Sequence, residues 1–365
     1  MGGVVFLVSA KVCSQNKRIG WFSDTFEQNN GIATYLQEIL PVIKERDCFD
    51  VTLYTGRVSR DYAFPVESLR HVPFPLFPSY DLVLSPFKWF KCDVVHCHTP
   101  YLLGLKAAKL EMPKVVTAHF LPFHFIEWAF GTNPPKAIEN FGWGFESWFL
   151  NQFDIVVCQT KVGRKYFHKM GLKKPVQVIP NGMNLEKYKG GSAKRFYSNY
   201  GFKDYALFVG RVDASKHPEW IVEAARRLPK QLFVISGTGT MVDKLERLPN
   251  IKFLGRLSRS DLVDCYTAAS VVLMPSKVET EGLVAQEAMA CGTPVIISDN
   301  EILDEVVGDA GLVCRNADEL AQHVETIAGN PKLRKELSAM ALAKVAERDI
   351  HKSVDALFDL YEELL

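Results

Sequence analysis

Two hydrophobic patterns alternate along the first half of the chain. Short apolar runs rich in β-branched residues predict buried strands, and longer amphipathic stretches between them predict helices. The predicted strands span residues 18–23, 49–55, 93–98, 114–119, 154–160 and 175–180. The predicted helices span residues 29–45, 102–111 and 160–170. Strands that alternate with helices in this way indicate a parallel sheet wrapped by helical crossovers.

The same alternation starts again after a break in the pattern. A Pro-Asn-Gly turn at 180–182 and a Gly-Gly-Ser turn at 190–192 mark the break. Beyond it, the predicted strands span residues 205–211, 232–238, 251–255, 270–275, 293–298 and 311–314. The predicted helices span residues 217–228, 240–248, 258–269 and 281–290, and three helical segments follow from about residue 318. The second half therefore repeats the architecture of the first.

These patterns predict an α/β protein with two Rossmann-like, doubly wound domains that face a central cleft. We expect an N-terminal domain at 1–189, a linker at 190–204 and a C-terminal domain at 205–345. We expect residues 346–365 to form a helix that packs back on the N-terminal domain. A chain of 365 residues is long enough to bury two such cores.

The composition is typical of a soluble globular protein, with 47% hydrophobic and 23% charged residues. No apolar run reaches the roughly 20 residues that a membrane-spanning helix needs. The apolar opening lacks the basic start of a signal peptide, so we expect a cytoplasmic protein. Residues 1–200 contain 24 Lys and Arg against 16 Asp and Glu. This basic half would be drawn to an anionic surface such as the inner face of the cytoplasmic membrane, unless its lysines only solubilise the protein.

The eight cysteines are scattered and do not form a disulfide framework, which favours a reducing compartment. One segment, CDVVHCHTP at 92–100, combines cysteines with histidines and could suggest a metal site. Strand alternation places His96 and His98 on one face and Cys97 on the other, whereas zinc sites usually draw on two paired groups of ligands. We therefore do not expect a metal there, and one of the histidines could hold its loop by hydrogen bonds.

The segment ETEGLVAQEAMACGTPVIIS at 279–298 carries the strongest candidate chemistry. Glu279 precedes a predicted helix, Gly282 opens it, and Glu287 lies two turns inside it. A helix N-terminus offers unpaired N–H groups and a partial positive charge, which suit a phosphate. Glu287 could accept hydrogen bonds from sugar hydroxyls, and Glu279 could contact a group that the phosphate carries. The alternative is a surface helix with two solvated glutamates, which a lone E-x7-E pattern does not exclude.

Two cations follow the first predicted strand of the second half. Arg211 and Lys216 lie in the segment VGRVDASKH, and both can reach a diphosphate. Taken alone, two such cations are more often solvated surface residues. We expect them on a different loop of the same sheet edge as Glu279, and this combination indicates a nucleotide-sugar site.

With these motifs the chain resembles the retaining glycosyltransferases of family 4, which share the two-domain GT-B fold. The resemblance covers nearly the whole chain. Its second-half motifs are specific as a set: VIPNGMNLEKY, LFVGRVDASKHPEWIVEAARRL, VISGTGT, IKFLGRL and ETEGLVAQEAMACGTPVI. The first-half matches NNGIATYLQEIL, DVVHCHTP and VVTAHF are looser. Within the family, the chain looks most like the diacylglycerol glucosyltransferases, which PFPLFPSYDLVLSPF resembles, and the phosphatidylinositol mannosyltransferases.

The resemblance implies that the C-terminal domain binds the sugar donor. Arg211 and Lys216 would contact the diphosphate, and Glu287 would bind the ribose hydroxyls. Glu279 and His119 would face the transferred sugar and would form the catalytic set together with the two cations. Further donor contacts are implied at glycines or main-chain positions, namely Gly31, Gly237, Arg256, Leu257, Gly282, Leu283 and Val284.

Two places depart from the family pattern. The family often has two glycines in the loop after the first strand, where a side chain would obstruct the diphosphate. Here Asn30 precedes Gly31. Thr280 and Glu281 stand where small or aromatic residues are commoner, and we expect the extra carboxylate of Glu281 to alter contacts to the donor sugar.

The resemblance implies transfer of a hexose, from UDP-glucose or GDP-mannose, with retention of anomeric configuration. The acceptor hydroxyl would attack the face that the leaving nucleoside diphosphate vacates, and its proton would pass to the departing phosphate. The two cations and the helix N-terminus would stabilise the charge that develops there. No metal or other cofactor is then required, and no Asp-x-Asp motif stands out in the sequence.

Two aromatic segments, at 74–91 and 120–150, suggest the acceptor. Aromatic residues beside lysines suit a bilayer interface, so our preferred prediction is a lipid or glycolipid acceptor at an anionic membrane. The same aromatics could instead form a core between the domains. A soluble transferase with a sugar or small-metabolite acceptor, or a sugar-nucleotide binding protein without catalysis, would keep the same donor site. We expect no nucleic-acid partner.

Overall fold

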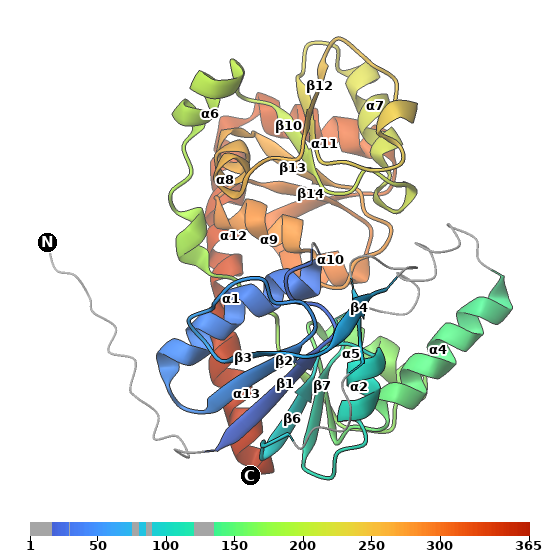
Figure 1. Ribbon diagram of the computed structural model, residues 1–365. Helices are drawn as coiled ribbons and strands as arrows, with labels where there is room; N and C mark the ends of the chain where they lie inside the picture. Colours follow the sequence, from blue (N-terminus) through green and yellow to red (C-terminus); the bar gives the residue numbers. More distant parts are fainter. Residues whose placement is uncertain (1–16, 29, 75–79, 85–89, 120–134) are drawn as a thin grey trace, which may run out of the picture. The chain divides into compact units, whose positions relative to one another are not determined.

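The computed structural model describes residues 17–28, 30–74, 80–84, 90–119 and 135–365. The chain folds into two compact units (Figure 1). The first unit has the bounds Met1–Ala118, Phe149–Val156 and Val354–Leu365, and the second has the bounds His119–Trp148 and Val157–Ser353. Outside the described residues lie the apolar opening of the chain and parts of both aromatic segments, at 75–79, 85–89 and 120–134.

The first sheet is built from the strands of the first half of the chain. They are β1 (Arg18–Ser23), β2 (Asp50–Thr55), β3 (Val66–Ser68), β6 (Val94–Cys97), β7 (Lys114–Thr117), β8 (Ile155–Cys158) and β9 (Val176–Val178). Their order is β3-β2-β1-β6-β7-β8-β9, and β1 pairs in parallel with both β2 and β6. The helices of this half are α1 (Gly31–Arg46), α2 (Leu102–Ala107), α4 (Lys136–Leu150) and α5 (Lys161–Lys169). Two short strands, β4 (His71–Pro73) and β5 (Asp81–Val83), form a separate antiparallel pair.

The second sheet repeats this arrangement with six parallel strands. They are β10 (Ala206–Val209), β11 (Phe233–Ser236), β12 (Ile251–Gly255), β13 (Val271–Met274), β14 (Val295–Ser298) and β15 (Gly311–Cys314). Their order is β12-β11-β10-β13-β14-β15, so the direction of winding reverses between β10 and β13. This is the strand order of a Rossmann sheet, and it confirms the predicted doubly wound fold class.

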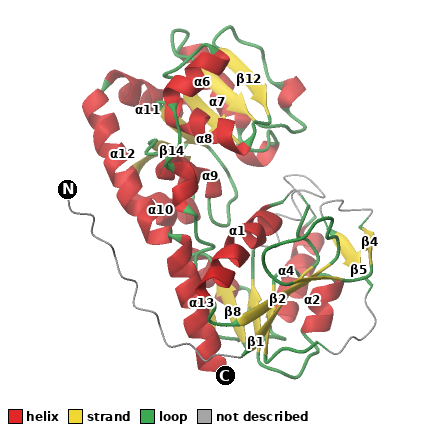
Figure 2. Cartoon of the chain, turned by 60° about the vertical axis from the view of Figure 1, so that its left-hand side comes forward, coloured by secondary structure: helices red, strands yellow, loops and turns green. Residues whose placement is uncertain are grey.

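Helices cover both faces of the second sheet (Figure 2). They are α6 (Ala193–Tyr200), α7 (Pro218–Arg227), α8 (Arg259–Ala268), α9 (Leu283–Ala290), α10 (Glu301–Val307), α11 (Ala317–Gly329) and α12 (Pro331–Val345). Because side chains alternate along β10, Leu207 packs among residues of α8, α9 and α12, whereas Phe208 packs among residues of α7 and α11. None of the helices in the described part of the chain is long and apolar enough to cross a bilayer.

One predicted helix is wrong and another is too long. Residues 240–248 form only a single 3₁₀ turn at Val242–Lys244. The main-chain N–H of Met241 is held by the carbonyl of Val212 at 3.0 Å, and Leu245 is buried in extended backbone, so the segment follows the sheet edge instead of coiling. The helix predicted at 102–111 ends at Ala107.

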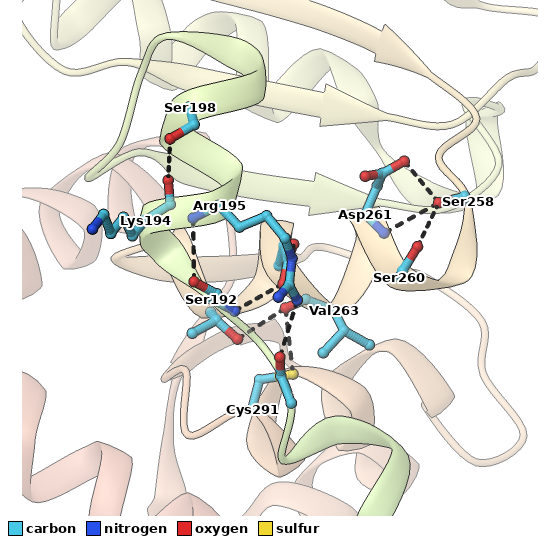
Figure 3. A network of polar contacts seen from close by, with 12 residues as sticks. Ser192, Lys194, Arg195, Ser198, Ser258, Ser260, Asp261, Val263 and Cys291 are labelled. Atoms are coloured by element: carbon cyan, nitrogen blue, oxygen red, sulfur yellow. Dashed lines mark hydrogen bonds and ion pairs between the residues drawn. The ribbon is translucent and has the colours of Figure 1, made fainter.

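Residues 190–204, the expected linker, contain helix α6. Ser192 caps this helix, and its main-chain N–H donates to Asp264 of α8 at 2.8 Å. Arg195 forms an ion pair with the same buried carboxylate, and Phe196 is fully buried. Figure 3 shows the Arg195 side chain extending from α6 toward Val263 of the neighbouring helix α8, with Ser192 at the start of α6. Helix α6 is therefore fixed to α8 as part of the second unit.

The last helix, α13 (Ile350–Leu364), contributes to the core of the first unit. The indole N–H of Trp21 on β1 donates to the hydroxyl of Tyr361 at 2.9 Å, and both residues are fully buried. Just before α13, two distant segments pair through their main chains. Met183 N–H donates to the Arg348 carbonyl at 2.9 Å, and Ile350 N–H donates to the Met183 carbonyl at 3.0 Å.

The cysteines that the structure describes differ in state. Cys48 is disulfide-bonded. The free thiols are those of Cys92, Cys97, Cys158, Cys265, Cys291 and Cys314. Burial raises the pKa of the Cys158 and Cys265 thiols to about 12, so these thiols stay protonated at neutral pH.

Candidate functional site

The charged segments singled out from the sequence follow two neighbouring strands of the second sheet. Arg211 and Lys216 lie in the loop after β10, and Glu279 lies in the loop after β13. These strands pair directly at the point where the strand order reverses, and ligands of doubly wound sheets bind outside the carboxyl ends of the strands at that point. The prediction that these residues share one sheet edge is confirmed. Their roles in binding stay predictions.

Lys216 and Glu279 form an ion pair across the two loops. Their side chains are only 18% and 12% exposed. The Lys216 ammonium also donates to the Val278 carbonyl at 3.4 Å, so two of its three N–H donors are used and one remains for a ligand. The Arg211 side chain is 59% exposed, and its guanidinium lies 3.4 Å from Asp213. The site therefore holds one lysine in place and leaves one arginine largely in solvent.

Main-chain hydrogen bonds join the loops at this edge of the sheet. Gly210 N–H donates to the Ser236 carbonyl at 3.0 Å, and Gly237 N–H donates to the Gly255 carbonyl at 2.8 Å. Gly237 has φ +145°, and a Cβ added there would lie 1.8 Å from the Gly210 carbonyl oxygen. The close approach of two backbones thus requires glycine at Gly237, independently of its predicted contact with the donor.

The N-terminus of α9 faces the same edge and lacks a side-chain cap among the described residues. Gly282 precedes the helix with φ +65°, and a Cβ there would lie 2.6 Å from a methyl group of Leu303. The first main-chain N–H groups of the helix, at Leu283 and Val284, have no partner within the helix. Leu283 is 36% exposed, so this end of α9 is open to a ligand. An uncapped helix N-terminus next to two cations is suited to a phosphate.

Glu287, inside α9, is held by two tyrosines that the sequence did not indicate. The Tyr188 hydroxyl donates to one carboxylate oxygen at 3.0 Å, and the Tyr266 hydroxyl donates to the other at 2.8 Å. Arg259 in turn donates to the Tyr188 hydroxyl at 2.8 Å. Tyr188 and Tyr266 lie 99 and 21 residues from Glu287, so no local sequence signal could have joined them.

The Glu281 carboxylate points into the protein, and its predicted effect on contacts to the donor sugar stays a prediction. Glu281 is only 2% exposed. It accepts hydrogen bonds from the main chain of Asn181 at 3.0 Å and from its side chain at 2.5 Å, and Arg348 lies 3.4 Å away. Burial raises the pKa of Glu281, and the guanidinium of Arg348 opposes this shift. The carboxylate therefore ties the loop before α9 to two distant segments.

Arg256 and Leu257 follow β12 at the same sheet edge. Arg256 is exposed, and Leu257 is half-buried against the core of the sheet. Directly before them, the Gly255 carbonyl bonds to the main chain of Gly237, which places this segment beside the loop after β11. Reading of a nucleotide base by this main chain stays a prediction.

Gly31 is the first residue of α1, and Asn30 is its N-cap. The Asn30 side chain accepts a hydrogen bond from the Ala33 main chain at 2.9 Å, which explains why an asparagine replaces the second glycine of the family pattern. Gly31 is exposed, and a Cβ added there meets no described atom within 4 Å. The described protein therefore has room for a side chain at this position, and the contact of Gly31 with the donor stays a prediction.

His119 follows β7 and is half-buried. Burial lowers the pKa of the His119 imidazole to about 3. The imidazole is therefore neutral at physiological pH. It can exchange hydrogen bonds with a sugar but cannot supply a positive charge, and its contact with the donor sugar stays a prediction.

His96 and His98 lie side by side, as strand alternation predicted, with ring centroids 4.4 Å apart. His96 is fully buried between the hydroxyls of Tyr361 and Thr117, the latter at 2.7 Å. His98 packs on the ring of Trp21 at 4.4 Å. His96 therefore anchors the C-terminal helix to the first sheet. Within the described ranges no group of His, Cys, Asp and Glu residues is arranged to hold a metal ion.

Comparison with known proteins agrees with this arrangement. The family model "Glycosyltransferase Family 4" matches residues 29–187, and "Glycosyl transferases group 1" matches residues 193–343. The chain is 25% identical to the alpha-monoglucosyldiacylglycerol synthase of Streptococcus pneumoniae, over 93% of this chain and 85% of that protein. It is 30% identical to the D-inositol 3-phosphate glycosyltransferase of Mycolicibacterium paratuberculosis, over 56% of this chain and 50% of that protein.

Among solved structures, HepE of Anabaena in complex with UDP-glucose has the same fold, with a TM-score of 0.75 and 18% identity. The match covers 95% of this chain and all of the other. Two doubly wound sheets, a charged switch point in the second sheet and the two matching family models define a glycosyltransferase with the GT-B fold. The chain belongs to glycosyltransferase family 4, as its motifs predicted.

Proposed function

We propose that the protein transfers a hexose from a nucleoside-diphosphate sugar to a hydroxyl group of a membrane lipid, with retention of anomeric configuration. The observation that carries this proposal is the ion pair of Lys216 with Glu279 at the β10–β13 switch point, with Arg211 in the same loop as Lys216 and the uncapped N-terminus of α9 shortly after Glu279 in the chain. UDP-glucose is the first choice of donor, because HepE, of the same fold, was solved with it. GDP-mannose is the second.

In the proposed reaction the bond between the sugar and the β-phosphate breaks, and negative charge develops on the leaving phosphate. The remaining N–H of Lys216, the Arg211 guanidinium and the first N–H groups of α9 are the groups that would stabilise this charge. Preorganised donors of this kind are worth roughly 3–4 kcal/mol each. The acceptor hydroxyl attacks from the face of the leaving group and passes its proton to the departing phosphate, so no protein base and no metal is needed.

A lipid acceptor is supported by a relative and by one helix. The streptococcal relative is named as a synthase of monoglucosyldiacylglycerol. In helix α4, the described part of the second aromatic segment, Phe141 is 75% exposed and Trp148 is 53% exposed. Large exposed aromatic side chains are unusual on a surface that meets only water, and they suit the interfacial region of a bilayer.

The donor is tested by thermal shift against UDP-glucose, GDP-mannose and other nucleotide sugars. A bound donor raises the melting temperature in proportion to the logarithm of its concentration. We expect UDP-glucose to give the largest shift. If no nucleotide sugar shifts the melting temperature at millimolar concentration, the proposed donor site is wrong.

Replacing Glu279 by Gln tests the catalytic role of this residue. The variant loses the charge opposite Lys216 but keeps the shape of the side chain, so we expect donor affinity to be unchanged or slightly tighter. Turnover should fall by roughly 100-fold, the size of effect seen when one preorganised polar group is removed. Initial rates measured over a range of labelled-donor concentrations separate donor affinity from turnover. Full turnover in the variant would show that Glu279 has no catalytic role.

Phe141→Ser tests the membrane contact. Because this side chain is 75% exposed, its loss should leave the melting temperature unchanged. We expect binding to vesicles that contain anionic lipid to weaken roughly fivefold, since about 1 kcal/mol of apolar contact is removed. Tyr197→Ser is the matched control, because Tyr197 on α6 is 51% exposed and is not part of the aromatic segment. Equal binding of all three proteins, or no binding by any, contradicts the proposal.

A second acceptor class is favoured by other relatives. Several inositol-phosphate glycosyltransferases are about 30% identical to this chain, although each match spans only part of both proteins. A water-soluble phosphorylated polyol is therefore the competing acceptor. Incubation with labelled UDP-glucose and either diacylglycerol vesicles or inositol phosphate distinguishes the two by where the label appears.

A further inference from the structure

Three polar residues from distant segments meet at the loop that carries Glu279. Glu281 is 2% exposed and Arg348 is 9% exposed, and Asn181 is half-buried. One oxygen of the Glu281 carboxylate accepts the main-chain N–H of Asn181 at 3.0 Å and lies 3.4 Å from the Arg348 guanidinium. The other oxygen accepts the Asn181 side-chain amide at 2.5 Å. Both oxygens are therefore bonded inside the protein, and we call these three residues the Glu281 cluster.

The charges of the Glu281 cluster contribute little to the stability of the fold. Taking a carboxylate and a guanidinium out of water costs about as much as their attraction returns, and apolar side chains of the same volume often stabilise a fold equally well. A buried carboxylate does supply direction, because its hydrogen bonds are complete in only one arrangement of the segments around it. The cluster therefore indicates that the loop before α9 has to keep one particular backbone position.

The loop after β13 is held at both of its ends. At its start, the Lys277 N–H donates to the Ser215 carbonyl in the loop after β10 at 2.9 Å. At its end, the Glu281 side chain is held by the cluster, and the Glu281 carbonyl accepts the buried side-chain amide of Gln286 at 2.9 Å. Glu279 lies between these two anchors, and α9 begins two residues after Glu281. The positions of the Glu279 carboxylate and of the helix start thus depend on the same short stretch of backbone.

We propose that Glu281 is a positioning residue, which through Asn181 and Arg348 fixes the loop that directs Glu279 and the N-terminus of α9 to one ligand. Its own carboxylate is buried and bonded, so it acts through Glu279 and not by contact with the ligand. Polar groups of a site lose much of their effect on a reaction when they are displaced by about 1 Å. The inference rests on the proposed sugar transfer and adds that the unusual carboxylate at this position sets the rate of turnover.

Steady-state kinetics and amide hydrogen exchange on the full chain test this inference. The main variant combines Glu281→Leu with Arg348→Met, so that no unpaired buried charge remains. Glu281→Gln is the milder variant, because its amide oxygen can still accept from the Asn181 main chain. The matched control combines Asp264→Leu with Arg195→Met. Asp264 is also 2% exposed and also accepts from a main-chain N–H and an arginine, but it joins α6 to α8.

With UDP-glucose as donor and vesicles that contain diacylglycerol, we expect the main variant to lower kcat roughly 30- to 100-fold. The KM for the donor should change less than about threefold, because the loss arises in the transition state. The Gln286 amide, which donates to the Gly282 carbonyl at 3.2 Å, should exchange about tenfold faster, because the loop opens more often without its second anchor. Glu281→Gln should lie between the wild type and the main variant in both measurements. The control should keep the wild-type kcat, KM and Gln286 exchange, even where its melting temperature falls.

Three results would overturn the inference: unchanged exchange of the Gln286 amide in the main variant, a loss of kcat no larger than that of the control, or a rise in KM without a fall in kcat. If the main variant does not fold, Glu281→Gln decides by the same three results. If the wild type does not transfer glucose from UDP-glucose to diacylglycerol, the proposed function fails for this pair of substrates. The exchange comparison needs no substrate and then decides by itself whether Glu281 holds the loop.

Discussion

Gly31, at the start of α1, and Gly237, in the loop after β11, both belong to the predicted donor site, but their surroundings differ. At Gly237 a Cβ would collide with the Gly210 carbonyl at 1.8 Å, so the protein itself excludes a side chain. At Gly31 no described atom lies within 4 Å of an added Cβ. The sequence alone does not tell these two glycines apart, and the packing shows that only Gly237 is required by the protein itself.

Gly31→Ala should therefore impair binding without harming the fold. Alanine is favoured over glycine within a helix by roughly 0.5–1 kcal/mol, so the melting temperature should stay the same or rise slightly. We expect affinity for the nucleotide sugar to fall at least about tenfold, because the methyl group would occupy space needed by the diphosphate. Gly237→Ala is the contrasting control and should lower the melting temperature. An alanine at 31 that leaves affinity intact would show that this space is not used by the donor.

At the scale of secondary structure, long periodic patterns were predictable and short or tertiary-dependent elements were not. Every predicted strand has a counterpart in the structure, because buried parallel strands give continuous apolar runs. The strands β3, β4 and β5 have three residues each, too few for a periodic signal. The segment 240–248 has helical spacing, but the main-chain bond of Met241 to Val212 and the burial of Leu245 in extended backbone hold it, so tertiary contacts override its propensity.

The attachment of helix α6 to helix α8 through Asp264 can be tested by substitution. Asp264 is 2% exposed and accepts from the Ser192 main chain and from Arg195. Asp264→Ala leaves the part-buried main-chain N–H of Ser192 and the half-exposed guanidinium of Arg195 without this partner, so we expect the free energy of unfolding to fall by about 1–3 kcal/mol. Glu186→Ala is the control, because it removes only an exposed ion pair with Lys189. This variant should change the free energy of unfolding by less than about 0.5 kcal/mol. Urea titration compares the two, and similar effects would contradict a pinning role for Asp264.

For the whole molecule, the sequence predicted which functional residues share an edge but not which of them touch. Parallel strands all end at one edge, so the loops of Lys216 and Glu279 were expected to be neighbours, whereas the ion pair between these residues, 63 positions apart, appears only in the structure. The direction in which a loop side chain points depends on distant partners. Glu281 turns inward because Asn181 and Arg348, 100 and 67 residues away, meet it there. No pattern in the sequence encodes such a meeting.

Two buried carboxyl groups make the folding stability of the protein depend on pH, and the sign of this dependence follows from their pKa shifts. Burial raises the pKa of Glu146 to about 8 from its ordinary value near 4.5. Between these values the folded protein binds a proton that the unfolded chain lacks, so stability is lost as the pH rises through this window. Burial also raises the pKa of Asp24 to about 6, which gives a loss of the same sign at lower pH.

Glu146→Gln removes one of these two contributions. We expect the melting temperature of the variant to fall less than that of the wild type between pH 6 and pH 8, and the variant to be the more stable protein at pH 8. The difference should not exceed about 5 kcal/mol, the free energy that corresponds to the full shift. The loss of stability between pH 4 and pH 6 that is due to Asp24 should be the same in both proteins. Parallel melting curves from pH 6 to pH 8 would contradict the assignment.

The main-chain pairing of Met183 with Arg348 and Ile350 has a consequence for engineering. The segment from Met183 to Arg348 begins and ends at positions that lie next to each other in the structure, as the ends of an inserted domain do. It contains the whole second sheet, together with Lys216, Glu279 and helix α9, which carries Glu287. Because its two junctions lie side by side, this stretch can be exchanged for that of another family member without altering the ends to which it must connect. Chimeras cut at these junctions should inherit the donor preference of one parent and the acceptor of the other.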